Sequence, residues 1–306
     1  MKRLHRPVMT SQVTDYMGSL RGGRFADLTF GEGGHTEILL DGGAARVIAV
    51  DRDLEAIEHY REQGRFRSDP RLSLHHAPFS TFSTLFSDEH FDGILLDLGV
   101  STRQLLTPER GFSFLGEAAL DMRMDRSDCN PVAPEVIRTA PLADIAHHLE
   151  IAGVRRPDRV AKLLKDQAIN GLLRSTQDLS NLARGAHDKG HPATQLFLGV
   201  RLLVNRELDE ISSTLPALVD RVHPGGRIVV ITFHSTEDRL VKRSFASLSG
   251  KCICESVFCD CPRIQRVTIL TPKPIIPTRE ETYTNRRARS AKLRAVMRIE
   301  NDSVHA

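Results

Sequence analysis

The sequence predicts an α/β fold in which a parallel sheet, with helices on both faces, is interrupted by an all-helical insertion. Strand-like apolar runs alternate with helical patterns in the first third of the chain, which is typical of a parallel sheet. Residues 121–205 contain no convincing strand, and strand-like runs return after them. We therefore expect residues 1–120 and 206–306 to build the sheet domain, with 121–205 as a separate helical domain.

The expected strands are short runs rich in apolar and β-branched residues. They cover residues 24–28, 46–50, 72–76, 91–96, 227–233, 267–270 and 295–299. The expected helices show amphipathic periodicity. They cover residues 36–40, 54–64, 131–150, 159–173 and 197–215. A further helix is expected after Ser175 and Asp178, whose spacing is that of an N-cap.

The composition excludes several classes of protein. Of the 306 residues, 40% are apolar and 26% charged, which excludes a wholly disordered chain. No apolar run approaches the ~20 residues that cross a bilayer, so we expect no membrane span. The charged start has no apolar segment after it, which disfavours a secretory signal. Five cysteines in a chain this long do not indicate a disulfide scaffold, so we expect a cytoplasmic protein.

The charge is concentrated near the C-terminus. The formal net charge is +3, but residues 279–298 carry seven basic side chains against Glu280 and Glu281. This basic C-terminal segment could attract a polyanion such as nucleic acid. A solvated helix face is the alternative interpretation.

A glycine-rich stretch follows the first expected strand and begins a helix. Residues 27–35 read Asp-Leu-Thr-Phe-Gly-Glu-Gly-Gly-His. Glycines allow the backbone to approach a ligand closely at a helix N-terminus. The spacing of Gly31, Gly33 and Gly34 differs from the dinucleotide fingerprint Gly-x-Gly-x-x-Gly, which disfavours a pyrophosphate ligand. A tight turn without a ligand is the alternative.

Asp51 and Asp53 follow the second expected strand, about 20 residues after the glycines. A carboxylate at this position can accept hydrogen bonds from the two ribose hydroxyls of a nucleoside. Together with the glycine loop, this pattern favours an adenosine cofactor without a phosphate. S-adenosylmethionine fits that description.

Asp97 follows the third buried strand, and His234 follows the strand at 227–233. In open α/β sheets, ligands bind beyond the carboxyl ends of the strands, so Asp97 is expected near the glycine loop. A helix cap is the alternative for Asp97. It is the stronger alternative at His234, because Ser235 and Asp238 have N-cap spacing.

The chain resembles the bacterial 16S rRNA cytosine-N4 methyltransferases of the RsmH, or MraW, family. The matching stretches are residues 5–8, 27–35, 51–53, 91–104, 110–114, 120–125, 191–194, 204–208, 224–242 and 287–293. The resemblance implies a class I (Rossmann-like) S-adenosylmethionine-dependent methyltransferase sheet with an inserted helical substrate-recognition domain. It also implies methylation of N4 of a cytosine in the decoding centre, at position 1402 of 16S rRNA.

The resemblance further implies a cofactor pocket. Its residues would be Gly33, Gly34, His35, Asp53, Phe79, Asp97 and Gln104. Gly33, Gly34 and His35 would line the methionine part of the cofactor. Asp53 would bind the ribose and Phe79 would pack on the adenine. Asp97 and Gln104 would complete the pocket. From the sequence alone, ordinary core packing is the alternative for Phe79.

Asp97 is also the expected catalytic residue. The lone pair of cytosine N4 is delocalised into the ring, and a carboxylate that accepts an N4 hydrogen would favour the attacking geometry. The base must leave its stack to reach such a site. Candidates for substrate contact are Arg123, Asn205 and His234. The segment from Arg286 to Arg294, with Arg123 and Arg126, is expected to hold the RNA backbone.

Two features stand apart from the family pattern or from the expected chemistry. Members of the family usually carry Tyr-Gly-Glu-Glu in the inserted domain, where this chain has Ala-Gly-Val-Arg-Arg at residues 152–156. Four cysteines, at positions 252, 254, 259 and 261, could hold zinc, although Cys-x-Cys is tighter than the usual ligand spacing. A loop of reduced thiols is the alternative. No metal is expected at the cofactor and catalytic site.

Two other functions are weighed against this one. A nicotinamide-dependent oxidoreductase shares the sheet but requires the dinucleotide fingerprint, which is missing. An RNA-binding assembly factor with a vestigial cofactor pocket would bind RNA without transferring a methyl group. The expected partner is 16S rRNA within the small ribosomal subunit, and the sequence leaves open both naked RNA as the substrate and a homodimer.

Overall fold

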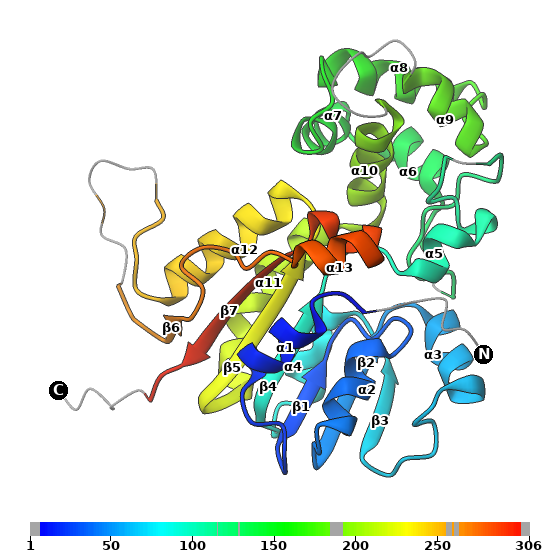
Figure 1. Ribbon diagram of the computed structural model, residues 1–306. Helices are drawn as coiled ribbons and strands as arrows, with labels where there is room; N and C mark the ends of the chain where they lie inside the picture. Colours follow the sequence, from blue (N-terminus) through cyan, green and yellow to red (C-terminus); the bar gives the residue numbers. More distant parts are fainter. Residues whose placement is uncertain are drawn as a thin grey trace. The chain divides into compact units, whose positions relative to one another are not determined.

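The computed structural model describes residues 7–114, 116–127, 129–183, 192–254, 259 and 263–300. They form two compact units (Figure 1). The sheet unit comprises Met1–Gly99 and Asp209–Ala306, and the helical unit comprises Val100–Leu208. The helical unit is thus wider than the insertion of 121–205 expected from the sequence.

The sheet unit contains a seven-stranded sheet in the order β3-β2-β1-β4-β5-β7-β6. The strands are β1 (Arg24–Asp27), β2 (Arg46–Asp51), β3 (Leu72–His76), β4 (Phe91–Asp97), β5 (Val222–Thr232), β6 (Val267–Ile269) and β7 (Lys292–Arg298). The pairs among β1 to β5 are parallel, and β7 runs antiparallel to both β5 and β6. This arrangement confirms the expected class I (Rossmann-like) methyltransferase sheet.

The sheet is covered by helices and is buried at its centre. The helices of this unit are α1 (Thr10–Met17), α2 (Gly34–Asp41), α3 (Leu54–Gln63), α4 (Phe82–Leu85), α12 (Ser235–Leu248), α13 (Arg279–Thr284), and α11 (Glu207–Leu218), which begins two residues before the unit boundary. The short 3₁₀ turns η1 (Phe79–Thr81), η3 (Val219–Arg221) and η4 (Arg286–Ser290) complete it. Ile94, Leu95 and Leu96 of β4 are all fully buried, as expected for a parallel strand covered on both faces.

The helical unit packs its helices around an apolar core of its own. Its elements are α5 (Thr102–Leu106), η2 (Pro108–Arg110), α6 (Ala133–Thr139), α7 (Leu142–Ile151), α8 (Pro157–Ile169), α9 (Thr176–Ala183) and α10 (Pro192–Asn205). Leu149, Leu164 and Val200 are buried at its centre. Among the residues described in this unit, strand-like pairing is limited to an isolated bridge between Ala119 and Ser175.

Two expected long helices are each divided in two. The helix expected over 131–150 is broken before α7, because Pro141 has no N–H to donate and restricts the residue before it to extended backbone. The helix expected over 197–215 is broken at Arg206, whose φ of 52° lies in the left-handed region. No helix among the described residues is long and apolar enough to cross a membrane.

Candidate active site

Three carboxylates mark the ends of three neighbouring strands. Asp27 ends β1, Asp51 ends β2 and Asp97 ends β4. Since β1 pairs in parallel with both β2 and β4, these carboxyl ends meet at one edge of the sheet. The chain order reverses around β1 here, which is where open α/β sheets bind their ligands.

The glycine-rich loop after β1 is fastened to both neighbouring strands. The backbone N–H of Leu28 donates to the carbonyl of Leu95, 2.9 Å away, and that of Phe30 donates to Val50 at 3.0 Å. Gly33 has a φ of 79°, and a Cβ there would lie 2.5 Å from the ring of Tyr60. Only glycine fits both constraints, so the position of the loop is set by its packing.

Asp51 connects the two loops that follow β1 and β2. Its Oδ2 accepts from the backbone N–H of Gly31 at 2.6 Å, and its Oδ1 accepts from that of Asp53 at 2.8 Å. Burial raises the pKa of Asp51 to about 6, although the two N–H donors favour its charged form. Asp51 therefore shapes the loops with both of its oxygens.

Asp27 holds the first turn of α2 against the end of β1. Its Oδ2 accepts from the hydroxyl of Thr36 at 2.8 Å, and its Oδ1 accepts from the backbone N–H of Thr29 at 3.3 Å. Burial raises the pKa of Asp27, since the carboxyl group is excluded from water. This residue was expected only as part of the glycine-rich stretch, without a role of its own.

His35 and Asp97 form a buried pair beside this loop. His35 Nε2 lies 3.4 Å from Asp97 Oδ2, and the two side chains are 5% and 16% exposed. Burial disfavours the charged imidazole, but Asp97, Asp27 and Glu281 outweigh it and raise the pKa of His35. Nδ1 of His35 and Oδ1 of Asp97 are buried without a hydrogen-bond partner among the described residues. Buried polar atoms of this kind are costly unless a ligand satisfies them.

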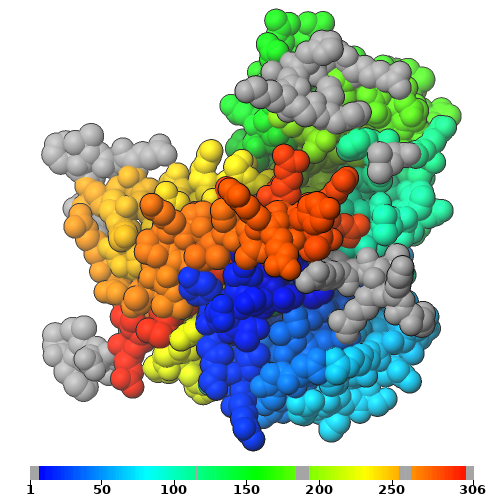
Figure 2. Space-filling model, in the orientation of Figure 1, coloured from blue at the N-terminus to red at the C-terminus, as the bar shows by residue number. Residues whose placement is uncertain are grey.

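Glu281 joins this site from the far end of the chain. It lies on α13, and its Oε1 accepts from the backbone N–H of Met9 at 2.5 Å. Figure 2 shows the orange C-terminal segment against the blue N-terminal segment on one face. Sequence reasoning missed this contact because 272 positions separate the two residues and no motif links them.

Asp53 and Phe79 lie in the loops after β2 and β3. Asp53 is 2% exposed and is the N-cap of α3, with its Oδ1 accepting from the backbone N–H of Glu55 at 3.2 Å. Phe79 begins η1 and is half-buried. Both therefore lie beyond the carboxyl ends of the strands, the side of the sheet that carries Asp97.

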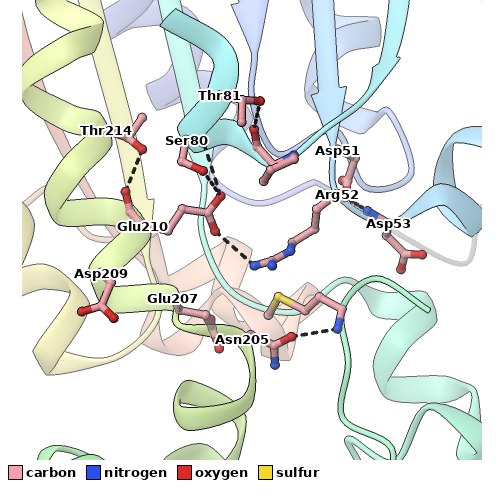
Figure 3. Close-up of polar contacts among 12 residues, drawn as sticks. Asp51, Arg52, Asp53, Ser80, Thr81, Asn205, Glu207, Asp209, Glu210 and Thr214 are labelled. Carbon is pink, nitrogen blue, oxygen red and sulfur yellow. Dashed lines mark hydrogen bonds and ion pairs between the residues drawn. The ribbon is translucent and has the colours of Figure 1, made fainter. Parts of the chain in front are cut away.

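An ion pair that the sequence did not reveal ties these loops to α11 (Figure 3). Arg52 Nη1 lies 3.1 Å from Glu210 Oε2, and Glu210 is almost buried. Oε1 of Glu210 accepts from the hydroxyl of Ser80 at 3.0 Å and from its backbone N–H at 3.3 Å. Glu210 thus fixes the loop that carries Asp53 and the loop that carries Phe79.

Three expected site residues belong to the helical unit. Gln104 closes a capping box with Ser101 at the start of α5. Arg123 forms an ion pair with Asp121, with Nε and Oδ1 2.7 Å apart. Burial alone would raise the pKa of Asp121, but the hydrogen bonds and charge of Arg123, together with the charge of Arg126, lower it. The third of these residues is Asn205, the last residue of α10.

Asn205 is buried and bonded to backbone. Its Oδ1 accepts from the N–H of Met124 at 2.8 Å, and its Nδ2 donates to the carbonyls of Met122 at 2.8 Å and Arg201 at 2.9 Å. These bonds hold the end of α10 against the segment that contains Arg123. A role of Asn205 in substrate contact stays a prediction.

His234 is the N-cap of α12 and forms a capping box with Glu237. Its Nδ1 accepts from the backbone N–H of Glu237 at 3.3 Å, and its Nε2 lies 2.8 Å from the fully buried carboxylate of Glu237. The capping pair expected at Ser235 and Asp238 is therefore wrong by one position. Asp238 instead pairs with Arg294 at 2.6 Å.

The basic C-terminal segment is divided between structure and surface. Arg294 is 5% exposed and Lys292 also contacts Asp238, at 3.4 Å, while Arg298 donates to the carbonyl of Val222. The exposed basic residues of the segment are Arg279, Arg286, Arg287 and Arg289. About half of the basic side chains of the segment therefore hold β7 in place. The sequence pattern did not indicate this structural role.

Comparisons with known proteins agree with this geometry. The family model described as the MraW methylase family matches residues 2–299. The chain is 38% identical to the ribosomal RNA small subunit methyltransferase H of Oleidesulfovibrio alaskensis, over 96% of this chain and 95% of that one. It is 39% identical to the protein of the same name from Synechococcus sp., over 96% and 92%. The chain therefore belongs to the MraW methylase family and is a methyltransferase whose sheet unit has the class I (Rossmann-like) fold.

Proposed function

We propose that this protein transfers the methyl group of S-adenosylmethionine to N4 of a cytosine in 16S rRNA, at position 1402 in the decoding centre. The relatives named ribosomal RNA small subunit methyltransferase H support a ribosomal substrate. The observation that carries the chemistry is the buried pair of His35 and Asp97, with buried polar atoms that lack partners, beside a glycine loop at the switch point of the sheet. The reaction takes place in the cytoplasm on the small ribosomal subunit.

The residues at this edge fit the cofactor. The ligand has two ribose hydroxyls as donors and a positive charge on sulfur, and the edge offers the carboxylates of Asp53 and Asp97. Asp51 uses both oxygens on backbone N–H groups, and Asp53, which the family resemblance implies as the ribose ligand, would accept from the ribose hydroxyls. Gly33, Gly34 and His35 would line the methionine part, and Phe79 would pack on the adenine. The role that the family resemblance implies for Gln104 in the cofactor pocket stays a prediction.

When bound, the cofactor supplies a methyl group activated by its positively charged sulfur. The protein must then position the acceptor nitrogen about 3 Å from the methyl carbon, in line with the carbon–sulfur bond. Oδ1 of Asp97 is the acceptor for an N4–H of the cytosine. This hydrogen bond reduces the delocalisation of the N4 lone pair, and Asp97 takes up the proton that N4 loses as the carbon–nitrogen bond forms.

The substrate must reach Asp97 as an unstacked base. The exposed Arg279, Arg286, Arg287 and Arg289 would hold the RNA backbone, because phosphate contacts position a nucleic acid without reading its sequence. Arg123, Asn205 and His234 are the further candidates for substrate contact. The capping role of His234 leaves its imidazole at the carboxyl end of β5, next to β4 in the sheet.

The test is to map the methyl groups of 16S rRNA by mass spectrometry in cells with and without the gene. The proposal predicts that one N4-methyl group on a cytosine disappears on deletion and returns with the wild-type gene, but not with Asp97→Ala. A rRNA whose methylation is unchanged by deletion contradicts the proposed function. Restoration by Asp97→Ala contradicts the role of Asp97.

A further inference from the structure

A cluster of thiols lies in the sheet unit in the segment after α12. The sulfur atoms of Cys252, Cys254 and Cys259 all lie within 4.8 Å of one another. Cys252 Sγ is 3.0 Å from Cys254 Sγ and 3.0 Å from Cys259 Sγ. None of the three is in a disulfide. Cys261, which the sequence analysis grouped with them, lies outside the described residues.

The base of this segment is closed by backbone pairing. Ser249 and Gln265 form an antiparallel bridge, and the N–H of Arg266 donates to the carbonyl of Leu248 at 2.8 Å. Figure 1 places this base between the end of α12 and the start of β6. The thiols therefore belong to a closed loop whose two ends are already held together.

Apolar packing does not account for the gathering of the three thiols. Cys252 and Cys254 are exposed and Cys259 is half-buried. The large apolar side chains that lie near them in the segment, Ile253 and Ile264, are 37% and 64% exposed. Without a core, a loop of this kind needs a cross-link to hold three side chains at one point.

A side chain of α12 holds the backbone between the first two thiols. Arg243 on α12 donates from Nη2 to the carbonyl of Ile253 at 3.1 Å, which fixes the backbone between the first two cysteines. Lys251 and Arg263 flank the cluster along the chain, and both are exposed. The thiols are thus attached to α12 through the backbone that carries them.

The sulfur positions match a tetrahedral zinc site. With zinc–sulfur bonds of about 2.3 Å, two thiolates on one tetrahedral ion are roughly 3.8 Å apart. The observed separations, from 3.0 Å to at most 4.8 Å, bracket that value. Thiolate ligands select zinc over hard cations such as magnesium and calcium.

We propose that Cys252, Cys254 and Cys259 bind one zinc ion, which holds the loop after α12 in place. Three thiolates occupy three of the four tetrahedral positions, as in structural zinc sites. The site is separate from the carboxylates at the end of β4 and takes no part in the methyl transfer. Its role is to fix the segment that carries Lys251 and Arg263.

The test measures metal content in the full chain, purified under reducing conditions from cells supplied with zinc. We expect one zinc per chain in the wild type and loss of most of that zinc in Cys252→Ser, Cys254→Ser and Cys259→Ser. Cys129→Ser is the matched control, because Cys129 is an exposed free cysteine in the helical unit. It should keep its full zinc content.

Cobalt provides a second reading that does not depend on activity. Replacement of zinc by Co²⁺ should give the thiolate charge-transfer and tetrahedral d–d absorption bands in the wild type and in Cys129→Ser, but not in Cys252→Ser. A wild-type chain without zinc, with or without oxidised thiols, overturns the proposal. So does a Cys252→Ser variant that keeps one equivalent of zinc and a normal cobalt spectrum.

Discussion

The carboxyl edge of the sheet and the core of the helical unit both bury polar side chains, but they treat them differently. In the helical unit, Asn205 gives its amide group to three backbone partners. At the sheet edge, Nδ1 of His35 and Oδ1 of Asp97 are buried without any partner among the described residues. In the helical unit the buried polar group bonds to the backbone and stabilises the fold, whereas we propose that the buried atoms at the sheet edge bind a ligand.

This contrast predicts opposite results for mutation. A buried group with all its partners present stabilises the fold, and its removal leaves those partners unsatisfied. A buried group without partners costs stability, and its removal should damage the chemistry rather than the fold. Substitutions in the two regions, together with the pH dependence of cofactor binding, test this difference.

Asp97→Ala should lower the rate of methyl transfer by about 10²- to 10⁴-fold, the usual contribution of a general base. Affinity for S-adenosylmethionine should stay within about tenfold, because the other carboxylates remain. Single-turnover kinetics and calorimetry measure the two quantities. Asp88→Ala, which removes an exposed carboxylate of the same unit, is the control and should keep the parental rate. Parental turnover in Asp97→Ala would show that this carboxylate has no catalytic role.

Asp53→Ala should weaken cofactor binding by roughly 10- to 100-fold, the cost of lost hydrogen bonds to a charged acceptor. It should also cost about 1 kcal/mol of stability, because Asp53 caps α3. Asp53→Ser separates the two effects, since serine caps a helix nearly as well but offers no carboxylate. Calorimetry and urea unfolding are the measurements. The assignment of the ribose to Asp53 fails if the serine variant binds the cofactor normally.

Asn205→Ala should destabilise the helical unit by about 1–3 kcal/mol, because it strands one backbone N–H and two carbonyls. Cofactor affinity should change little, because the glycines and carboxylates proposed to bind the cofactor lie in the sheet unit. Urea unfolding measures the stability, and calorimetry measures the affinity for the cofactor. Thr139→Ala removes an exposed hydroxyl that bonds only within α6 and should be nearly neutral. A stable Asn205→Ala protein that fails to methylate RNA would instead support substrate contact.

The pH dependence of cofactor binding should reveal Asp51, whose pKa is about 6. Protonation removes one of the acceptors that hold Gly31 and Asp53, so affinity should fall below pH 6 by at most tenfold per pH unit. The Asp51→Asn variant should bind the cofactor weakly at every pH, and its affinity should not change between pH 5 and 8. Titration of the cofactor between pH 5 and 8 is the measurement, and an unchanged dependence in Asp51→Asn would contradict the assignment.

Asp51 changes the free energy of unfolding with pH in the opposite direction to cofactor affinity. Because the folded pKa of Asp51 lies above its unfolded value, its contribution to stability is greatest at low pH and is lost as the pH rises through about 6. Weaker cofactor binding at pH 5 therefore cannot arise from unfolding linked to Asp51. Urea unfolding at pH 5 and pH 8, in the wild type and in Asp51→Asn, checks this control.

Much of the fold could be predicted because strands in a parallel sheet are buried on both faces. The apolar run that ends at Asp97 is visible as a strand without any structure, and the strand–helix alternation predicts the class of sheet. Helix breaks were harder. Pro141 carries a signal that the expected 131–150 helix overlooked. The left-handed Arg206 carries none, because arginine is an ordinary helix former.

The position of the candidate site could be predicted from residues that are neighbours in the chain. The contacts between residues far apart in the chain could not. The glycine loop, Asp51, Asp53 and Asp97 follow strands, and the position of a strand end can be inferred from the sequence. The pairs Arg52 with Glu210 and Met9 with Glu281 join segments far apart, and ordinary charged residues carry no mark of their partners.

A crystal structure of the protein with S-adenosylhomocysteine would show whether the buried pair of His35 and Asp97 faces the cofactor. We expect the amino acid part of the ligand to lie beside Gly33–His35, its ribose hydroxyls to contact Asp53, and its sulfur to face Oδ1 of Asp97. A ligand bound elsewhere, with His35 and Asp97 left without new partners, would contradict it.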